Sequence, residues 1–406
     1  MKILLVNKFH YMKGGSERYY FTLAEAFKSL GHEVVFFAMK DSKNLPCAQG
    51  KYFVSTASVN GGLKAKLNMA LHIAYSKEAY KNMKALLSAE KPDLVILNLV
   101  HKQITLSILD AIREYSSDLP VFWTMHDLIA VCPSYTMLDG NGNICEKCLG
   151  GKVENCKKNR CIRGSSLMSR LSVYEAKQIR KKGWYDKVTA YICPSEFYKN
   201  KLEEGRFTKS PVLFMRNPLS INTSYEVNDK DKGYLLYFGR LSREKGVKTL
   251  INAANDEGKK LIICGTGPME KELKSYVTEN KIENIEFKGF VQGKELDDYI
   301  KNSRCAVLPS EWYENGPYSA MEALALGKPL IVSDKGGLPE LVKDGENGYV
   351  YSDYEGLKKS ISKVFSLEEK EYSELCKNAM EFAKTNFDPI AYAQKILTLK
   401  DEISKQ

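Results

Sequence analysis

Short apolar runs alternate with longer amphipathic stretches along the whole chain. The runs are apolar at successive positions, which is typical of parallel strands buried on both faces, and the stretches between them favour helices. The predicted strands are residues 2–9, 33–40, 94–99, 121–127 and 190–195 in the first half, and 234–241, 260–267, 285–290, 305–310 and 329–334 in the second. The pattern therefore predicts an α/β protein with two parallel sheets.

A polar, turn-rich stretch separates the two series of strands. Residues 217–233, with the sequence NPLSINTSYEVNDKDKG, favour a linker. The first domain is then residues 1–216 and the second is residues 234–387. An amphipathic helix over residues 388–406 follows the completed second series, and we expect it to pack back on the first domain.

Length and composition indicate a globular protein with two domains. The chain has 406 residues, of which 44% are hydrophobic and 27% charged, and no apolar run approaches the roughly 20 residues that cross a bilayer. The sequence passes from Met1 straight into a predicted strand, without the basic start and cleavage site of a signal peptide. We therefore expect a cytoplasmic protein whose ten cysteines are reduced thiols or metal ligands.

Two carboxylates follow the predicted strand at 305–310, one in the loop after it and one in the next helix. In parallel sheets, ligands bind beyond the carboxyl ends of the strands, and the free N–H groups of a helix start suit a phosphate. Glu314 lies in the loop and Glu322 in the helix, so both could accept hydrogen bonds from hydroxyl groups of one ligand. The helix start comprises Asn315, Gly316, Pro317 and Tyr318. The alternative is that both glutamates are solvated surface charges.

Other crossings from strand to helix supply cations and glycines. At the end of the strand 234–241, Arg240 and then Lys245 could neutralise a diphosphate. The glycines that would allow close backbone approach are Gly14, Gly15, Gly239, Gly265 and Gly267. For the last two, a tight turn explains the glycines equally well. The sequence lacks the G-x-G-x-x-G pattern and the ribose-binding acid of a nicotinamide site, which disfavours hydride transfer.

A cysteine-rich segment, residues 132–161, lies within the first domain. Cys145 and Cys148 form a C-x2-C pair, and Cys156 and Cys161 follow closely enough to complete a structural zinc site with four thiolate ligands. Cys132 is a spare candidate. The wide spacing of the second pair leaves free or redox-sensitive thiols as the alternative.

Positive charge is concentrated in the first half of the chain. The net charge is +10, but within residues 1–220 Lys and Arg number 33 against 19 Asp and Glu. The segment Lys152–Lys187 contains a basic amphipathic helix, and residues 64–84 form a second basic stretch. The apolar positions of the first helix are Leu167, Leu171, Tyr174 and Ile179, with Trp184 close to its end. We expect the first domain to dock on an anionic membrane surface, at the inner face of the membrane, and to bind no nucleic acid, since no such binding module is recognised. Packing of both apolar faces in the core is the alternative.

Taken together, the motifs resemble the retaining glycosyltransferases of family 4. They are GGSER (14–18), LGHEV (30–34), HD (126–127), YFGRLSREKG (237–246), the E-x7-E run ENGPYSAME (314–322) and ALGKP (325–329). The resemblance implies the GT-B fold, with two Rossmann-like domains facing a central cleft, the first for the acceptor and the second for a nucleotide-diphosphate sugar. It also implies a saccharide or lipid-linked acceptor and a role in surface polysaccharide or glycolipid assembly.

The same resemblance implies roles for the residues that bind the donor. Arg240 and Lys245 would hold the diphosphate, Glu314 would contact hydroxyl groups of the donor sugar, and Glu322 would contact the ribose. Gly15 would come near the phosphates when the domains close. His126 matches the family histidine near the 6-position of the sugar.

The implied mechanism uses no catalytic metal. The leaving diphosphate takes the proton of the acceptor hydroxyl on the same face of the sugar, and Asp127 could orient the ring of His126. The only D-x-D sequence in a loop, Asp229 to Asp231, falls in the predicted linker and indicates solvated charge. Two alternatives remain: a non-catalytic partner subunit that binds a sugar nucleotide, and a GT-B-shaped sugar-nucleotide epimerase.

Overall fold

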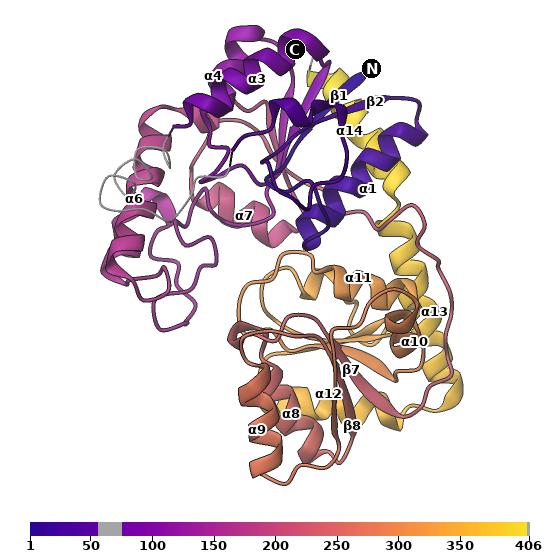
Figure 1. The fold of residues 1–406 in the computed structure, drawn as a ribbon. Helices are drawn as coiled ribbons and strands as arrows, with labels where there is room; N and C mark the ends of the chain where they lie inside the picture. Colours follow the sequence, from indigo (N-terminus) through magenta and orange to yellow (C-terminus); the bar gives the residue numbers. More distant parts are fainter. Residues whose placement is uncertain (56–74, 404–406) are drawn as a thin grey trace. The chain divides into compact units, whose positions relative to one another are not determined.

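The computed structural model of the protein describes residues 1–55 and 75–403, and the chain forms two compact units (Figure 1). Unit 1 consists of Met1–Ile221 and Pro389–Gln406, and unit 2 consists of Asn222–Asp388. Each unit contains a six-stranded sheet whose paired strands are all parallel. The predicted α/β fold class is therefore confirmed.

The sheet of unit 1 has the strand order β2-β1-β3-β4-β5-β6. Its strands are β1 (Lys2–Val6), β2 (Glu33–Phe37), β3 (Leu94–Leu97), β4 (Val121–Thr124), β5 (Ala190–Cys193) and β6 (Val212–Phe214). Its helices are α1 (Gly15–Ser29), α3 (Lys77–Glu90), α4 (Ser107–Tyr115), α5 (Glu154–Lys158), α6 (Ser166–Lys181), α7 (Glu196–Glu204) and α14 (Pro389–Ile403). The strands β3, β4 and β5 are buried at every position, because their unbroken apolar sequences pack on both faces of the sheet.

The sheet of unit 2 has the order β12-β11-β10-β7-β8-β9. Its strands are β7 (Tyr234–Phe238), β8 (Lys260–Cys264), β9 (Ile285–Gly289), β10 (Cys305–Leu308), β11 (Leu330–Ser333) and β12 (Gly348–Tyr351). Its helices are α8 (Val247–Asp256), α9 (Glu270–Glu279), α10 (Lys294–Lys301), α11 (Tyr318–Ala325), α12 (Tyr354–Ser366) and α13 (Glu369–Asn386).

Both strand orders contain a point at which the direction of winding reverses. Within unit 1 the reversal lies between β1 and β3, and within unit 2 it lies between β7 and β10. Connections leave such a pair of neighbouring strands toward opposite sides, which opens a crevice beyond their carboxyl ends. The fold of each unit thus marks one place where a ligand fits best.

The segment predicted as a linker, residues 217–233, is divided between the units and is partly anchored. Residues 217–221 belong to unit 1. The rest is held on unit 2: the Glu226 N–H donates to the Ala325 carbonyl at 3.0 Å, and Asp231 forms an ion pair with Arg304 at 3.1 Å. Asp231 is therefore a structural ion-pair partner and not a solvated charge.

The helix α14 lies against α1 in unit 1 (Figure 1). The hydroxyl groups of Tyr19 and Tyr392 are hydrogen-bonded at 3.0 Å, and their rings meet edge to face at 5.8 Å. Ala393 and Ile396 of α14 are fully buried. A segment that follows all of unit 2 in the sequence therefore completes the core of unit 1.

Candidate functional site

In unit 2, two loops meet beyond the carboxyl ends of β7 and β10. The β7 loop ends in a short 3-10 helix, Arg243–Lys245, followed by Gly246 with φ +65°. A Cβ on Gly246 would lie 1.9 Å from the Pro309 carbonyl oxygen of the β10 loop, so only glycine allows the loops to approach this closely. The approach brings Lys245 beside Glu314.

Lys245 and Glu314 form a largely buried ion pair at this meeting point. The Lys245 ammonium donates to Glu314 Oε1 at 2.5 Å, and the Ser310 hydroxyl donates to the same oxygen at 2.6 Å. Burial raises the pKa of the Glu314 carboxyl, but Lys245 and Ser310 outweigh it, so the pKa is lowered overall. Glu314 is thus an ionised carboxylate, and the ammonium retains N–H groups beyond the one that Glu314 accepts.

A further loop positions the backbone of Glu314. The Gly337 N–H donates to the Glu314 carbonyl at 2.7 Å, and a Cβ on Gly336 would lie 2.2 Å from that carbonyl oxygen. The sequence contained no signal for this contact, since the loop after β11 is far from Glu314 in the chain.

The other cation of the predicted donor site, Arg240, is exposed. Its carbonyl accepts a hydrogen bond from the Tyr237 hydroxyl at 2.8 Å, which fixes the backbone at the end of β7. Within the described residues its guanidinium makes no ion pair or hydrogen bond. Arg240 and Lys245 therefore differ: the first is an open cation, and the second is already neutralised by Glu314.

The helix α11 begins one residue later than expected. Pro317 is the residue before the helix, with extended φ −71° and ψ 131°, and Tyr318 is the first helical residue. Asn315 and Gly316 precede it in the loop, half-buried, and Glu322 is a half-buried residue one turn into the helix. The two glutamates of the E-x7-E run thus lie on a loop and a helix that follow one strand.

Three of the predicted glycines serve backbone packing within unit 2. The Gly239 N–H donates to the Cys264 carbonyl at 3.0 Å. A Cβ on Gly265 would lie 1.9 Å from the Gly239 carbonyl oxygen, and one on Gly267 would lie 2.2 Å from that of Leu241. The loops after β7 and β8 therefore require these glycines whether or not a ligand is bound.

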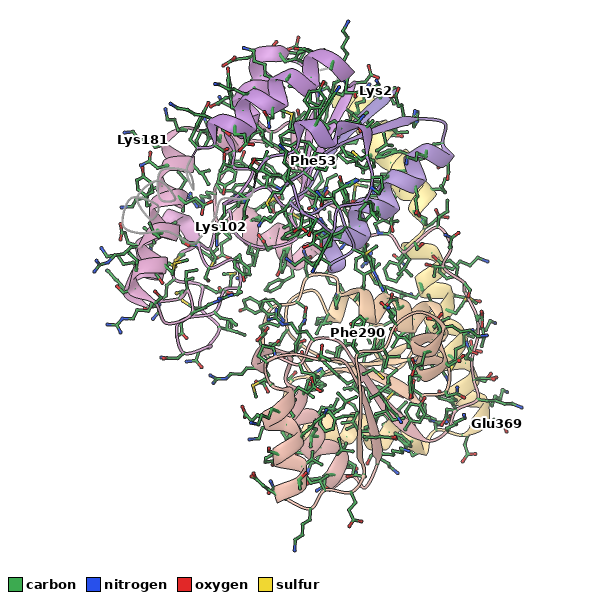
Figure 2. The ribbon with its side chains drawn as sticks, in the orientation of Figure 1. Lys2, Phe53, Lys102, Lys181, Phe290 and Glu369 are labelled. Carbon is green, nitrogen blue, oxygen red and sulfur yellow. The ribbon has the colours of Figure 1, made fainter. Side chains whose placement is uncertain are left out.

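An aromatic residue at the same edge of the sheet was not predicted. Phe290, labelled in Figure 2, directly follows β9. The residue is 70% exposed. An exposed phenyl ring next to the carboxyl ends of β8 and β9 offers a flat apolar surface for a ligand.

In unit 1, Gly14 and Gly15 are exposed at the start of α1. Gly14 is in extended conformation, and a Cβ on it would meet no atom closer than Glu17 Oε2 at 3.7 Å. The fold itself therefore tolerates a side chain at Gly14, in contrast to Gly246.

The strand β4 leads to His126, which is oriented by Asn98 and not, as expected, by Asp127. His126 Nε2 lies 3.0 Å from Asn98 Oδ1, while Asp127 Oδ1 accepts the Ile129 N–H at 3.0 Å. Because the Asn98 amide oxygen can only accept, Nε2 carries the proton. Burial lowers the pKa of His126 to about 3, so the imidazole is neutral.

The cysteine-rich segment gathers its thiols around a small apolar cluster. Cys148 and Cys156 are buried with Val153 and Val173, and Cys161 packs against them. A hydrogen bond between the thiols of Cys156 and Cys161 lowers the pKa of Cys161 and raises that of Cys156. Across residues 1–55 and 75–403, no three His, Cys, Asp or Glu side chains are placed to hold a metal ion. The zinc site, with Cys145 as its fourth ligand, therefore stays a prediction of the sequence.

The basic helix α6 does not present its apolar residues as predicted. Ile179 is buried, and Trp184 is buried with its indole N–H donating to Asp110 at 2.9 Å. Leu167 and Tyr174 are 60% and 40% exposed. The apolar residues that were expected on one face of the helix are therefore partly in the core and partly at the surface. Of the second basic stretch, residues 64–74 lie outside the described part, and the rest begins α3.

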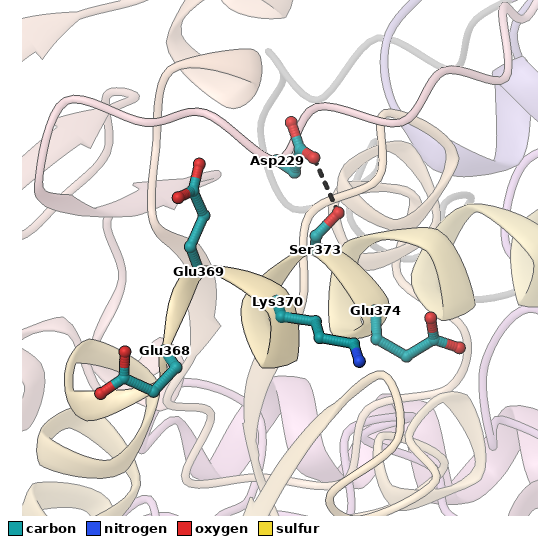
Figure 3. Close-up of a pocket in the computed structure, with 6 residues that line it drawn as sticks. All are labelled: Asp229, Glu368, Glu369, Lys370, Ser373 and Glu374. Carbon is teal, nitrogen blue, oxygen red and sulfur yellow. Dashed lines mark hydrogen bonds between the residues drawn. The ribbon is translucent and has the colours of Figure 1, made fainter.

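A hollow of unit 2 lies elsewhere, at the start of α13 (Figure 3). It has a volume of about 550 Å³ and is lined by Asp229, Glu368, Glu369, Lys370, Ser373 and Glu374. Four carboxylates would repel a diphosphate, so the anion-binding candidate remains the edge near Arg240. Among residues 1–55 and 75–403, none of the helices combines the length and the apolar character of a membrane span.

Sequence models of two families match nearly the whole chain. The model of Glycosyltransferase Family 4 matches residues 13–219, and that of Glycosyl transferases group 1 matches residues 223–384. An uncharacterized glycosyltransferase of Methanocaldococcus jannaschii, MJ1178, is 30% identical over 195 residues, which cover 48% of this chain and 54% of the relative. The chain thus spans about half the length of that relative.

Two other proteins match nearly the whole chain at lower sequence identity. An uncharacterized 42.6 kDa protein in the cps region of Klebsiella pneumoniae is 23% identical over 375 residues, covering 88% of this chain and 91% of the relative. The crystal structure of HepE from Anabaena in complex with UDP-glucose matches with a TM-score of 0.65 at 16% identity, covering 99% of this chain and 100% of that one. At 16% identity, the structural similarity shows a shared fold and nothing further.

Proposed function

Because this chain belongs to glycosyltransferase family 4, we propose that it transfers a sugar from a nucleotide-diphosphate donor to a saccharide or lipid-linked acceptor, with retention of configuration. Unit 2 binds the donor and unit 1 the acceptor. The product belongs to a surface polysaccharide or glycolipid, which the relative in the Klebsiella cps region favours. No catalytic metal takes part.

The observation that carries this proposal is the ion pair of Lys245 and Glu314 at the β7–β10 reversal point. Arg240 and the remaining N–H groups of Lys245 bind the diphosphate, while Glu314 accepts a hydrogen bond from a hydroxyl of the donor sugar. Glu322 accepts one from the ribose, and the exposed ring of Phe290 stacks on the base.

The reaction proceeds on one face of the donor sugar. The bond from the anomeric carbon to the diphosphate oxygen breaks, the acceptor oxygen bonds to that carbon, and the acceptor proton passes to the leaving diphosphate. Arg240, Lys245 and the N–H groups at the start of α11 stabilise the departing negative charge. His126 is neutral and directs its Nε2–H to Asn98, so it accepts a hydrogen bond at Nδ1 from a hydroxyl of the donor sugar.

The test is release of nucleotide from a panel of nucleotide sugars, with and without saccharide acceptors. We expect acceptor-dependent release for one donor, reduced roughly 10²-fold in Arg240→Ala, the scale for loss of one preorganised electrostatic contact. Lys271→Ala, an exposed cation on α9, is the matched control. Binding of nucleotide sugars without any release would leave the chain a non-catalytic subunit.

We further propose that unit 1 associates peripherally with anionic membranes through α6. Its exposed face combines Leu167, Met168 and Tyr174 with the exposed cations Arg170 and Lys181. Apolar side chains flanked by cations suit the headgroup region of an anionic leaflet. A lipid-linked acceptor would lie at that surface.

A further inference from the structure

A group of charged side chains lies at the reversal point of unit 1. Lys8 follows β1 by two residues, Lys102 lies in the loop after β3, and Asp127 lies in the loop after β4. The fourth member, Glu175, comes from α6. The first three are therefore at the carboxyl edge where the strand order of this unit places a ligand.

Glu175 is held in place although it is almost completely buried. Its side chain belongs to a residue only 4% exposed, and its Oε1 accepts the Lys102 N–H at 3.2 Å. Lys102 has φ +72°, a conformation that costs free energy for a residue with a side chain, and such strain is concentrated at functional sites. Burial raises the pKa of Glu175 to about 7, with Lys102 and Lys8 opposing the shift.

Lys8 is a half-buried cation that lacks an ion-pair partner. No carboxylate of the described residues lies within 4.0 Å of its ammonium, and its side chain makes no hydrogen bond there. Burial lowers the pKa of Lys8, while Asp127 and Glu175 act on it from a distance and oppose the shift. The Lys8 ammonium, which donates hydrogen bonds, and the Glu175 carboxylate, which accepts them, thus lie at the same edge of the sheet. They form no ion pair with each other.

We propose that Lys8 and Glu175 together bind one uncharged, hydroxyl-bearing sugar ring of the acceptor. The Lys8 ammonium donates a hydrogen bond to a ring hydroxyl, and the Glu175 carboxylate accepts one from another hydroxyl. The inference rests on the proposed function, because it names the acceptor class of that reaction. Both residues are positioning residues, since they orient the acceptor and touch no reacting atom.

The ionisation of Glu175 distinguishes a site for a neutral sugar from a site for a phosphate, because the two ligands would bind with opposite pH dependence. The ionised carboxylate is a stronger hydrogen-bond acceptor than the protonated carboxyl, so binding of a neutral sugar strengthens as pH rises through about 7. A phosphate held by Lys8 and Lys102 would show the opposite dependence, because the ionised carboxylate repels it. The groups facing Glu175 are Lys8, Lys102 and Tyr185. His126 stays neutral across this range and does not contribute.

The experiment is ligand-observed NMR titration of the full chain without donor. The probes are methyl α-glucoside, methyl α-galactoside and methyl N-acetylglucosaminide, with glucose 1-phosphate as the anion, at pH values about one unit below and above 7. We expect at least one neutral glycoside to bind several-fold more tightly at the higher pH. Glu175→Gln should abolish the pH dependence and weaken binding roughly tenfold, and Lys8→Met should weaken binding at both pH values.

The melting temperature of Glu175→Gln distinguishes a role of Glu175 in sugar binding from a purely structural role. A carboxyl whose folded pKa is raised destabilises the folded state above its unfolded pKa, so Glu175→Gln should melt no lower than the wild type at the higher pH while it loses the sugar. Unchanged sugar binding in both variants, or tighter binding of glucose 1-phosphate at the lower pH and in Glu175→Gln, overturns the proposal. Sugar binding of the expected kind in a chain that releases no nucleotide would overturn the proposed transferase and leave this inference standing.

Discussion

At the residue scale, the ion pair of unit 2 joins a well-buried acid to a more accessible base. The Glu314 side chain is 7% exposed, whereas that of Lys245 is 22% exposed. The lysine could reach water if its partner were removed, but the carboxylate could not. The two halves of the pair therefore contribute unequally to stability, although they contact the same ligand in the proposed function.

Lys245→Met should lower the melting temperature more than Glu314→Gln. The first variant leaves a buried carboxylate without its cation, at a cost on the order of 3–5 kcal/mol, while the second leaves a cation that solvent can reach. Because the folded pKa of Glu314 is lowered, the contribution of the pair is present above the unfolded pKa of 4.5 and disappears as pH falls through the folded value. Thermal unfolding of both variants across pH checks this, and equal losses at neutral pH would contradict it.

We propose that Gly14 of unit 1 comes near the donor phosphates during the reaction, so Gly14→Ala should fold normally and bind the donor nucleotide several-fold more weakly. The fold has room for a Cβ at Gly14, so only a ligand brought close to the start of α1 would meet it. Gly246→Ala is the contrasting variant, since its Cβ would collide with the Pro309 carbonyl and lower the melting temperature. The checks are thermal unfolding and nucleotide titration. An unchanged dissociation constant in Gly14→Ala would remove that residue from the phosphate site.

At the element scale, the sequence predicted those strands and helices that a continuous pattern of neighbouring residues marks. The ten longer apolar runs all became strands, but β6 and β12 were not predicted. β6 has three residues, all only half-buried, and β12 begins with glycine, so neither carries a continuous buried pattern. The E-x7-E run was found because a strand, a loop and a helix start stand in sequence order.

Contacts between distant segments account for the part of the site that the sequence did not predict. Glu175 is one acid in a strongly basic helix, and only the packing of α6 brings it to the Lys102 N–H. Asn98 is likewise an ordinary polar residue until β3 and β4 pair and set it against His126. Such partners are separated by 28 residues or more, and no local pattern marks them.

In the cysteine-rich segment, Cys161 should be the thiol that alkylates first. It is partly exposed and its pKa is lowered by the hydrogen bond with Cys156, whereas Cys148 and Cys156 are buried and have raised pKa values. Timed iodoacetamide labelling of chelator-treated protein, read by peptide mass, checks the order. Metal analysis before chelation tests the zinc prediction separately. Faster labelling of Cys148 or Cys156 would mean that the thiols are arranged differently.

At the scale of the whole molecule, charge is divided between the two units. Residues 1–220 carry the whole positive excess, and unit 2 presents an acidic hollow at Glu368, Glu369 and Glu374 (Figure 3). An anionic surface would therefore attract unit 1 and repel this part of unit 2. The charge distribution therefore favours approach of unit 1, and not of this part of unit 2, to an anionic surface.

Vesicle co-sedimentation should show binding that requires anionic lipid and weakens at high salt. Changing Arg170, Lys181 and Lys182 of the α6 region to Glu should abolish it, since each cation near the surface contributes about 1 kcal/mol. The matched control changes Lys370, Lys377 and Lys384 on α13 to Glu, the same change in charge on unit 2. Equal loss of vesicle binding in both variants would mean that only the net charge matters. Equal binding to neutral and anionic vesicles would exclude electrostatic docking.

The return of α14 to unit 1 also has a consequence during protein synthesis. Unit 2 is continuous from Asn222 to Asp388, so all of it has left the ribosome before α14 can follow. Domains usually fold in the order in which they are made. Here the first unit to emerge must wait, with the α1 surface around Tyr19 uncovered, until Tyr392 and Ile396 arrive. The unit made second is therefore the one that can finish folding first, and the nascent unit 1 keeps an apolar surface uncovered throughout the synthesis of unit 2.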